Sequence, residues 1–297
     1  MSRLCVLGNA GLDLRLPVPR LPRPGETLVG GAASRAPGGK GLNQAVAAAR
    51  CGLGPVRFCA PLGTDAEGRE VAARLAAEPL DATFHHPGPP TDLSVLLVSP
   101  DGENAIVTAG ACADALGAAP AAAFAAEAGA GGWVLLQGNL SLDATAAALA
   151  AARAAGARCL LNLAPLRWPA MALLPGLDLA VANAVEARDL TGLEAEAAAL
   201  ALHRAGAAVA VVTLGAAGLA MATGAGVRRL PAAPARVRDT TGAGDAFCGV
   251  LAAMLAAGAA PEPALAAAQR AGARTVEREG AFDALPDGPT LRALAAA

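Results

Sequence analysis

Short apolar runs alternate with longer alanine-rich, amphipathic stretches along most of the chain. Runs bounded by glycine and proline are typical of buried strands, and the longer stretches are typical of helices. We expect strands at 4–8, 133–137, 158–162, 177–183 and 208–215, and helices at 118–129, 143–155, 194–205, 243–258 and 262–278. This alternation predicts a three-layer α/β fold, a Rossmann-like, mainly parallel sheet with helices on both faces.

Two segments depart from the alternation. Residues 14–37 are rich in proline and glycine, which confines any strands there to sheet edges and turns. Residues 87–109 contain two apolar runs, and a turn is expected between them at Pro100, Asp101 and Gly102. We therefore expect a single α/β domain spanning 1–297, with a small β-sheet lid formed by the insertions 14–37 and 87–109.

Composition argues against several classes of function. The net charge is only −2, so the chain has no general attraction for nucleic acid or an anionic membrane. Its N-terminus does not fit a signal peptide, and no unbroken apolar run is long enough to span a bilayer. The six cysteines form no C-x-x-C pair, which favours a reducing, cytoplasmic location over a disulfide framework.

In a mainly parallel sheet, ligands bind beyond the carboxyl ends of the strands. The stretch DTTGAGD, residues 239–245, comes directly before an expected helix. Its glycines would let free N–H groups at the helix start approach an anion, and Asp245 would sit beside that anion. The carboxylate could take a proton from an attacking hydroxyl, or it could simply cap the helix; these residues alone leave both interpretations open.

The second notable stretch is GGKGLNQAVAAARCG, residues 38–52. Gly39 would allow a sharp entry into a helix, Lys40 would supply a cation, and Asn43 could both donate and accept hydrogen bonds. Together they could hold a polyol or a phosphate, although a solvated lysine at an ordinary helix start is the alternative. Neither the P-loop pattern nor the dinucleotide G-x-G-x-x-G pattern is present.

Both stretches resemble the two signature motifs of the ribokinase-like (PfkB) carbohydrate kinase family. Shorter matches follow in family order: GNxxxD at 8–13, PGET at 24–27, GTDAEG at 63–68, DGEN at 101–104, NxxE at 183–186 and TLGAAG at 213–218. The resemblance implies an ATP-dependent kinase that phosphorylates a primary hydroxyl of a small sugar. Ribose is the first expectation; a fructose-like sugar, another pentose or a nucleoside stays open.

The resemblance also implies roles for individual residues. Asp245 would be the catalytic base, and Gly242, Ala243 and Gly244 the anion hole for the γ-phosphate. The sugar would meet Asp13, Gly39, Lys40, Asn43 and Asn139. The nucleotide would meet Thr213, Gly215 and Gly218, while Asn183 and Glu186 would organise Mg²⁺ largely through waters. Many relatives bind K⁺ beside the anion hole, and the matching positions are Asp239, Thr241, Thr275, Arg278 and Gly280.

Two positions depart from the ribokinase pattern, and both fall in the sugar pocket. Gly11 stands where ribokinases usually carry Asn, and Asn139 stands near the position of a sugar-binding Glu. The resemblance further implies a homodimer through the lid, covering apolar residues among Val18, Leu28, Val29, Val95 and Leu97. Two other classes remain open: a non-catalytic sugar- or nucleotide-binding protein that keeps the fold, and, less well supported without G-x-G-x-x-G, an NAD(P)-dependent oxidoreductase.

Overall fold

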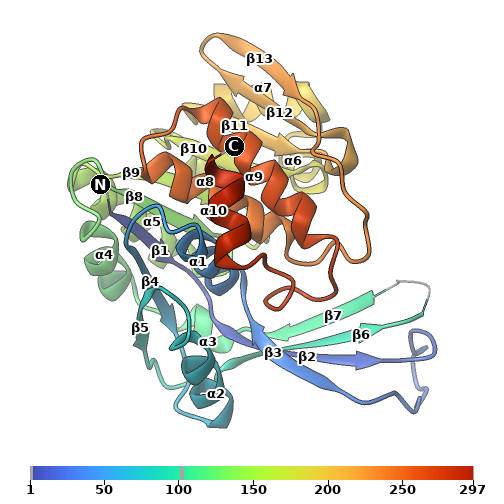
Figure 1. Ribbon diagram of the computed structural model, residues 1–297. Coiled ribbons are helices and arrows are strands. Elements are labelled where there is room, and N and C mark those ends of the chain that lie inside the picture. The colour runs from blue at the N-terminus through green and yellow to red at the C-terminus, as the bar shows by residue number, and fades with distance from the viewer. Residues whose placement is uncertain (1–2, 101–103, 297) are drawn as a thin grey trace.

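A large, mostly parallel sheet forms the centre of the computed structural model, which describes residues 3–100 and 104–296 (Figure 1). Within these residues the sheet has nine strands, in the order β13-β12-β11-β10-β9-β8-β1-β4-β5. Their bounds are β1 Leu4–Leu7, β4 Val56–Pro61, β5 Asp81–His85, β8 Trp133–Gln137, β9 Arg158–Asn162, β10 Leu179–Asn183, β11 Val209–Thr213, β12 Leu219–Thr223 and β13 Gly226–Leu230. Neighbours from β5 to β11 pair in parallel, and β12 and β13 join antiparallel.

Helices cover both faces of this sheet, as the alternation predicts. One face carries α1 Lys40–Arg50, α2 Ala66–Leu75, α8 Ala243–Ala256, α9 Pro261–Thr275 and α10 Gly288–Ala296. The other carries α3 Ala111–Asp114, α4 Ala118–Ala126, α5 Leu142–Ala154, α6 Ala184–Thr191 and α7 Ala195–Arg204. Strand β1 is buried on both faces, so Leu4 and Val6 enter one apolar core while Cys5 and Leu7 enter the other.

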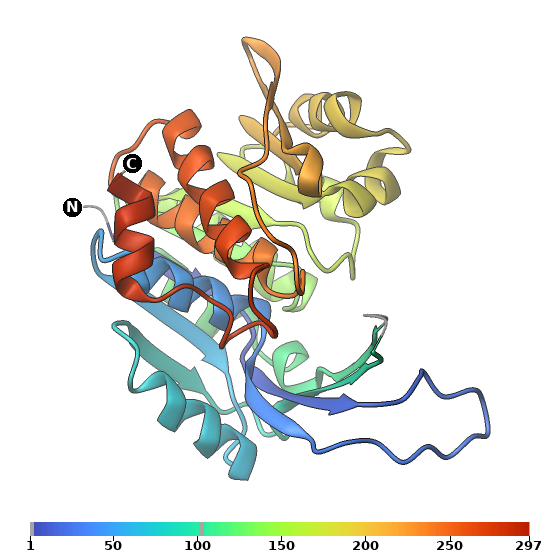
Figure 2. The ribbon, with the colours of Figure 1, turned by 45° about the vertical axis from the view of Figure 1, so that its right-hand side comes forward.

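A second sheet of four strands, in the order β3-β2-β6-β7, extends away from the main body (Figure 2). Its strands are β2 Gly11–Pro17, β3 Ser34–Gly38, β6 Asp92–Val98 and β7 Asn104–Ala109. We call this sheet the lid. The strands expected at 92–108 are confirmed, while residues 101 and 102 of the turn expected at Pro100, Asp101 and Gly102 lie outside the described residues.

The lid differs from the expectation in two details. Its first segment was expected to begin at residue 14, but strand β2 begins at Gly11 and therefore includes Asp13. Val18, expected as an exposed lid residue, is buried, and its N–H donates to the carbonyl of Val98 over 2.9 Å. Val29, in contrast, is 90% exposed.

No helix in residues 3–100 and 104–296 is both long enough and apolar enough to cross a bilayer.

Candidate active site

The start of helix α8 forms one side of the site. Gly242, its N-cap, has φ of 78°, a left-handed conformation that side chains disfavour, and a Cβ there would lie 2.9 Å from Cα of Ala281. Gly244 is different, because within the described chain no heavy atom lies within 4 Å of a Cβ built on it. Backbone geometry therefore requires glycine at 242, whereas glycine at 244 leaves open space that a ligand can fill.

That open space is a cavity of about 450 Å³. Residues from separate segments of the C-terminal half of the chain line this cavity. Among them are Thr213, Gly215, Gly218, Ala243, Gly244 and Phe247. Gly215 and Gly218 have positive φ and shape the turn after β11. All three expected nucleotide residues thus lie around one cavity with two of the expected anion-hole residues, and mostly apolar walls suit a nucleobase.

Asp245 lies in the first turn of α8 and is nearly fully buried. Both of its carboxylate oxygens accept hydrogen bonds from α1: Nδ2 of Asn43 donates to Oδ2 over 3.2 Å, and Nε2 of Gln44 donates to Oδ1 over 3.0 Å. Two neighbouring amides of one helix thus fix both oxygens. Gln44 was not among the expected site residues, although its place beside Asn43 in a buried motif was a usable signal.

Lys40 begins α1 beside this carboxylate. The negative charge of Asp245 raises the pKa of Lys40, burial opposes the rise, and Glu186 adds to it. A single ammonium group therefore feels both carboxylates, which come from α8 and α6. A cation in this place suits charge that builds on a transferring phosphoryl group.

Asp13 approaches the same site from lid strand β2. A Cβ on Gly38 would lie 2.3 Å from Cγ of Asp13, so the close pairing of β2 and β3 at this point requires glycine. Burial raises the pKa of Asp13 to about 6, against a hydrogen bond from Ser94, and the charge of Asp245 adds to the rise. The lid therefore contributes a carboxylate that lies close enough to Asp245 to interact with its charge.

Oδ1 of Asn43 and Oδ1 of Asn139 are among the buried amide oxygens that have no hydrogen-bond partner in the described residues. Buried acceptors without a partner are unusual, and they suit the hydroxyl groups of a polyol. Gly39 enters α1 with φ of 105°, and a Cβ there would lie 2.9 Å from the carbonyl oxygen of Asn9. Gly39 thus lets the chain turn tightly into α1.

Asn183 and Glu186 form a complete capping box at the start of α6. The N–H of Glu186 donates to Oδ1 of Asn183 over 2.9 Å, and the N–H of Asn183 donates to Oε2 of Glu186 over 2.8 Å. No cluster of three or more metal-ligating side chains occurs in residues 3–100 and 104–296. Mg²⁺ commonly keeps several waters and takes only one or two carboxylates plus phosphate oxygens, so the Glu186 carboxylate fits such a role.

The loop before α8 is organised by Asp239. Its Oδ1 accepts from both N and Oγ1 of Thr241, and its Oδ2 accepts from N of Gly280 over 2.9 Å. Burial alone would raise the pKa of Asp239, but the hydrogen bonds from Thr241 and Gly280 outweigh burial and lower it. The carboxylate therefore joins the 239–241 turn to the 275–280 segment.

The other two positions expected at a K⁺ site contribute differently. Oγ1 of Thr275 donates to the carbonyl of Ala271 in its own helix, and N of Arg278 donates to the carbonyl of Thr275. The Thr275 side chain and the Arg278 backbone N–H thus make hydrogen bonds within their own segment.

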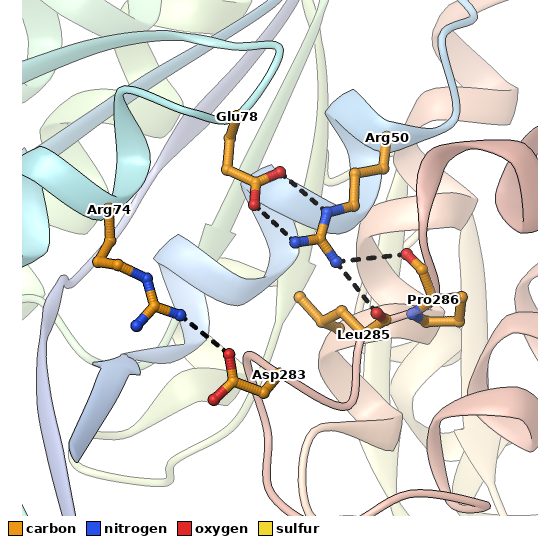
Figure 3. A network of polar contacts seen from close by, with 6 residues as sticks. All are labelled: Arg50, Arg74, Glu78, Asp283, Leu285 and Pro286. Carbon is orange, nitrogen blue, oxygen red and sulfur yellow. Dashed lines mark hydrogen bonds and ion pairs between the residues drawn. The ribbon is translucent and has the colours of Figure 1, made fainter.

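The chain after residue 280 is held by a group of polar side chains, Arg50, Glu78, Arg74 and Asp283, which we call the polar clamp (Figure 3). Arg50, near the end of α1, makes a two-pronged ion pair with Glu78 at 2.6 and 2.8 Å, and also donates to the carbonyls of Leu285 and Pro286. Arg74 of α2 pairs with Asp283 at 3.0 Å. The clamp holds the chain just after Ala281, the residue that contacts the Gly242 turn.

A sequence profile of the pfkB family carbohydrate kinases matches residues 1–288. The chain belongs to this family. It is a pfkB carbohydrate kinase, a phosphotransferase that acts on a sugar hydroxyl.

Relatives of this pfkB kinase include ribokinases. The chain is 32% identical to the ribokinase of Haemophilus influenzae over 291 residues, which covers 95% of each chain. The crystal structure of the Thermotoga maritima ribokinase superposes with a TM-score of 0.90 at 25% identity and covers 99% of both chains. The structure of Arabidopsis thaliana ribokinase complexed with ribose and ATP superposes with a TM-score of 0.84 at 27% identity, over 99% of this chain and 98% of that one.

Proposed function

We propose that this pfkB kinase uses ATP to phosphorylate the primary hydroxyl of a small sugar, with ribose as its substrate. The observation that carries the proposal is the buried carboxylate of Asp245, which lies between an open cavity at Gly244 and the polar groups Lys40, Asn43 and Asp13. The ribokinase names of its relatives, and the ribose and ATP of the Arabidopsis complex, support the choice of sugar.

In this proposal the nucleotide occupies the cavity and the sugar lies between the lid and α1. The hydroxyl oxygen of the sugar attacks the γ-phosphorus, the bond from that phosphorus to the β–γ bridging oxygen breaks, and ADP leaves. Asp245 accepts the hydroxyl proton. The N–H groups at Gly242, Ala243 and Gly244, together with Lys40, stabilise the negative charge on the phosphoryl oxygens.

Asp13, Gly39, Asn43 and Asn139 position the sugar. A carboxylate can accept from two hydroxyl groups at once, and the unpartnered amide oxygens of Asn43 and Asn139 supply further acceptors. The lid carries Asp13, so sugar binding at Asp13 would couple the lid to the exclusion of water.

Glu186 and Asn183 would hold Mg²⁺ mainly through waters, and the ion would neutralise phosphate charge. For K⁺ we propose the loops 239–241 and 275–280, with backbone carbonyls as ligands. A requirement for K⁺ would appear as a rise in turnover when K⁺ replaces Na⁺ at constant ionic strength.

We also propose that the protein forms a homodimer through the lid. Side chains alternate between the two faces of a strand, so the register places Leu14, Val95 and Val107 side by side, on the face opposite Asp13 and Ser94. Val107 is 74% exposed. Such an apolar sheet face favours a partner, and an identical lid is the partner we propose. Val107→Lys should then convert a dimer into a monomer in sedimentation experiments.

The free cysteines support a reducing, cytoplasmic location.

The test of the substrate is ATP consumption, measured by ADP formation, against ribose, deoxyribose, fructose and nucleosides with Mg²⁺. The proposal predicts that ribose gives the highest kcat/KM. A higher kcat/KM for a nucleoside or for fructose would overturn the choice of ribose while keeping the kinase.

A further inference from the structure

Behind the carboxylate of Asp245 lies a chain of two buried amides from two different elements. Nε2 of Gln44, in α1, donates to Oδ1 of Asp245 over 3.0 Å, and Nε2 of Gln137, the last residue of β8, donates to Oε1 of Gln44 over 2.9 Å. Both glutamines are fully buried. The chain therefore runs from the central sheet through α1 to the proposed catalytic base.

The direction of these hydrogen bonds follows from the chemistry of the groups. An ionised carboxylate only accepts, so Gln44 must turn its NH₂ group toward Asp245 and its oxygen toward Gln137. Gln137 must then donate, and its own oxygen faces Gly8, where a Cβ would lie only 1.9 Å away. That oxygen has no partner in the described residues.

An unpartnered buried oxygen calls for an explanation, because nearly all such groups in folded proteins are paired. Here the orientation that leaves Oε1 of Gln137 alone is also the one that presents a donor to Gln44. If Gln137 turned over, its oxygen would face the oxygen of Gln44, and Gln44 would tend to turn its NH₂ away from Asp245. The arrangement thus favours the geometry at Asp245 over hydrogen bonding at Gln137.

We propose that Gln137 and Gln44 are positioning residues that fix the orientation of the Asp245 carboxylate for proton transfer. Gln44 holds one oxygen and Asn43 holds the other, so the plane of the carboxylate cannot rotate freely. A base works only when its oxygen lies within hydrogen-bond reach of the hydroxyl proton. The inference rests on Asp245 being the base, as proposed above.

Two substitutions at Gln137 test this chain of hydrogen bonds from Gln137 through Gln44 to Asp245, which we call the relay. Gln137→Met keeps the volume and removes the donor, so Gln44 is free to turn; we expect kcat to fall about tenfold while KM for sugar and ATP stays within about twofold. Gln137→Glu adds a pH dependence. The new carboxyl group donates to Gln44 while protonated, but once ionised it only accepts, and it then draws the NH₂ of Gln44 away from Asp245.

The decisive quantity is kcat of Gln137→Glu divided by kcat of the native protein at each pH. We expect this ratio to be close to one at low pH and to fall as pH rises through the pKa of the new group. Thr145→Val is the matched control: it removes a buried hydroxyl that donates to the carbonyl of Ser141, the N-cap of α5, and should leave kcat unchanged. Urea unfolding of each variant reports the loss of stability separately.

The proposal is overturned if Gln137→Met, folded by circular dichroism, keeps native kcat, or if the ratio for a folded Gln137→Glu does not change with pH. Should Gln137→Glu fail to fold, the Gln137→Met kinetics decide. Asp245→Asn, measured alongside, separates a failure of Asp245 as the proposed base from a failure of the relay. If that variant retains native turnover, Asp245 is not the base, and the proposed mechanism fails together with the relay while the kinase activity stands; if it is inactive and the Gln137 variants are normal, only the relay fails.

Discussion

Asn43 and Asp245 lie 202 positions apart in the sequence, yet Nδ2 of Asn43 donates to Oδ2 of Asp245 over 3.2 Å. The contact joins the first turn of α1 to the first turn of α8. Two glycine-rich stretches that were notable separately in the sequence thus form one site. One supplies donors and a cation, and the other supplies the carboxylate and the N–H groups of a helix start.

Glycine should be needed for different reasons at 242 and 244. Gly244→Val would project into the open cavity, so we expect a protein with nearly native stability whose kcat/KM for ATP falls at least about a hundredfold. Gly242→Ala would place a side chain at φ of 78° against Ala281, and we expect a loss of about 1–2 kcal/mol in the free energy of unfolding. Urea unfolding and steady-state kinetics on both variants distinguish the effects; equal stability losses would contradict this account.

Sugar binding should depend on pH through Asp13. Burial raises the pKa of this carboxyl to about 6, so below that value it is protonated and loses an acceptor for the sugar hydroxyls. We expect KM for ribose to rise as pH falls through about 6 in the native protein, and Asp13→Asn to show a raised KM without this inflection. Asp92 also has a pKa raised by burial to about 6, so the same inflection persisting in Asp13→Asn would assign it elsewhere.

The same shift has a consequence for stability. A carboxyl whose pKa is higher in the folded than in the unfolded protein binds extra protons when folded. Its contribution is therefore present below the unfolded value near 3.8 and is lost as pH rises toward about 6. Relative to Asp13→Asn, the native protein should lose stability between these two values, measured by urea unfolding at a series of pH values. A difference that grows in the opposite direction would contradict the assignment.

The clamp at Arg50 should be worth more than its neighbour at Arg74. The Arg50 and Glu78 side chains are 17% and 12% exposed, against 46% and 62% for Arg74 and Asp283. Removing one partner of a largely buried pair leaves the other charge unpaired, so Arg50→Met should cost about 3 kcal/mol. Arg74→Met should cost less than about 1 kcal/mol. Chemical denaturation of both variants measures the difference, and similar losses would show that burial does not set the contribution.

Much of the fold is predictable from the sequence because the central strands are continuous apolar runs. Strands β8 and β9 have the bounds expected from WVLLQ and RCLLN. Strand β5 was missed because DATFH lies at the edge of the sheet and carries a mixed, half-exposed pattern. Helix α6 was not predicted, although the sequence carries the Asn183 and Glu186 spacing of a capping box at its start.

The site is predictable only in part, because its decisive contacts join distant segments. DTTGAGD indicates an anion site and a carboxylate, but no local pattern reports that Gln44 and Gln137 lie behind Asp245. Their position depends on how α1 crosses the carboxyl end of β8. Likewise, no local pattern reports that the N–H of Val18 donates to the carbonyl of Val98, 80 residues later.

The central claim is that Asp245 is the base that accepts the sugar proton. The most direct measurement is the rate of ADP formation with ribose and Mg²⁺ for the native protein and Asp245→Asn, together with an ATP-binding titration of both. The account predicts a fall in kcat of about a thousandfold, with ATP affinity changed by less than about threefold, because the amide keeps the shape and cannot take the proton. A variant that binds ATP and turns over at the native rate would contradict it.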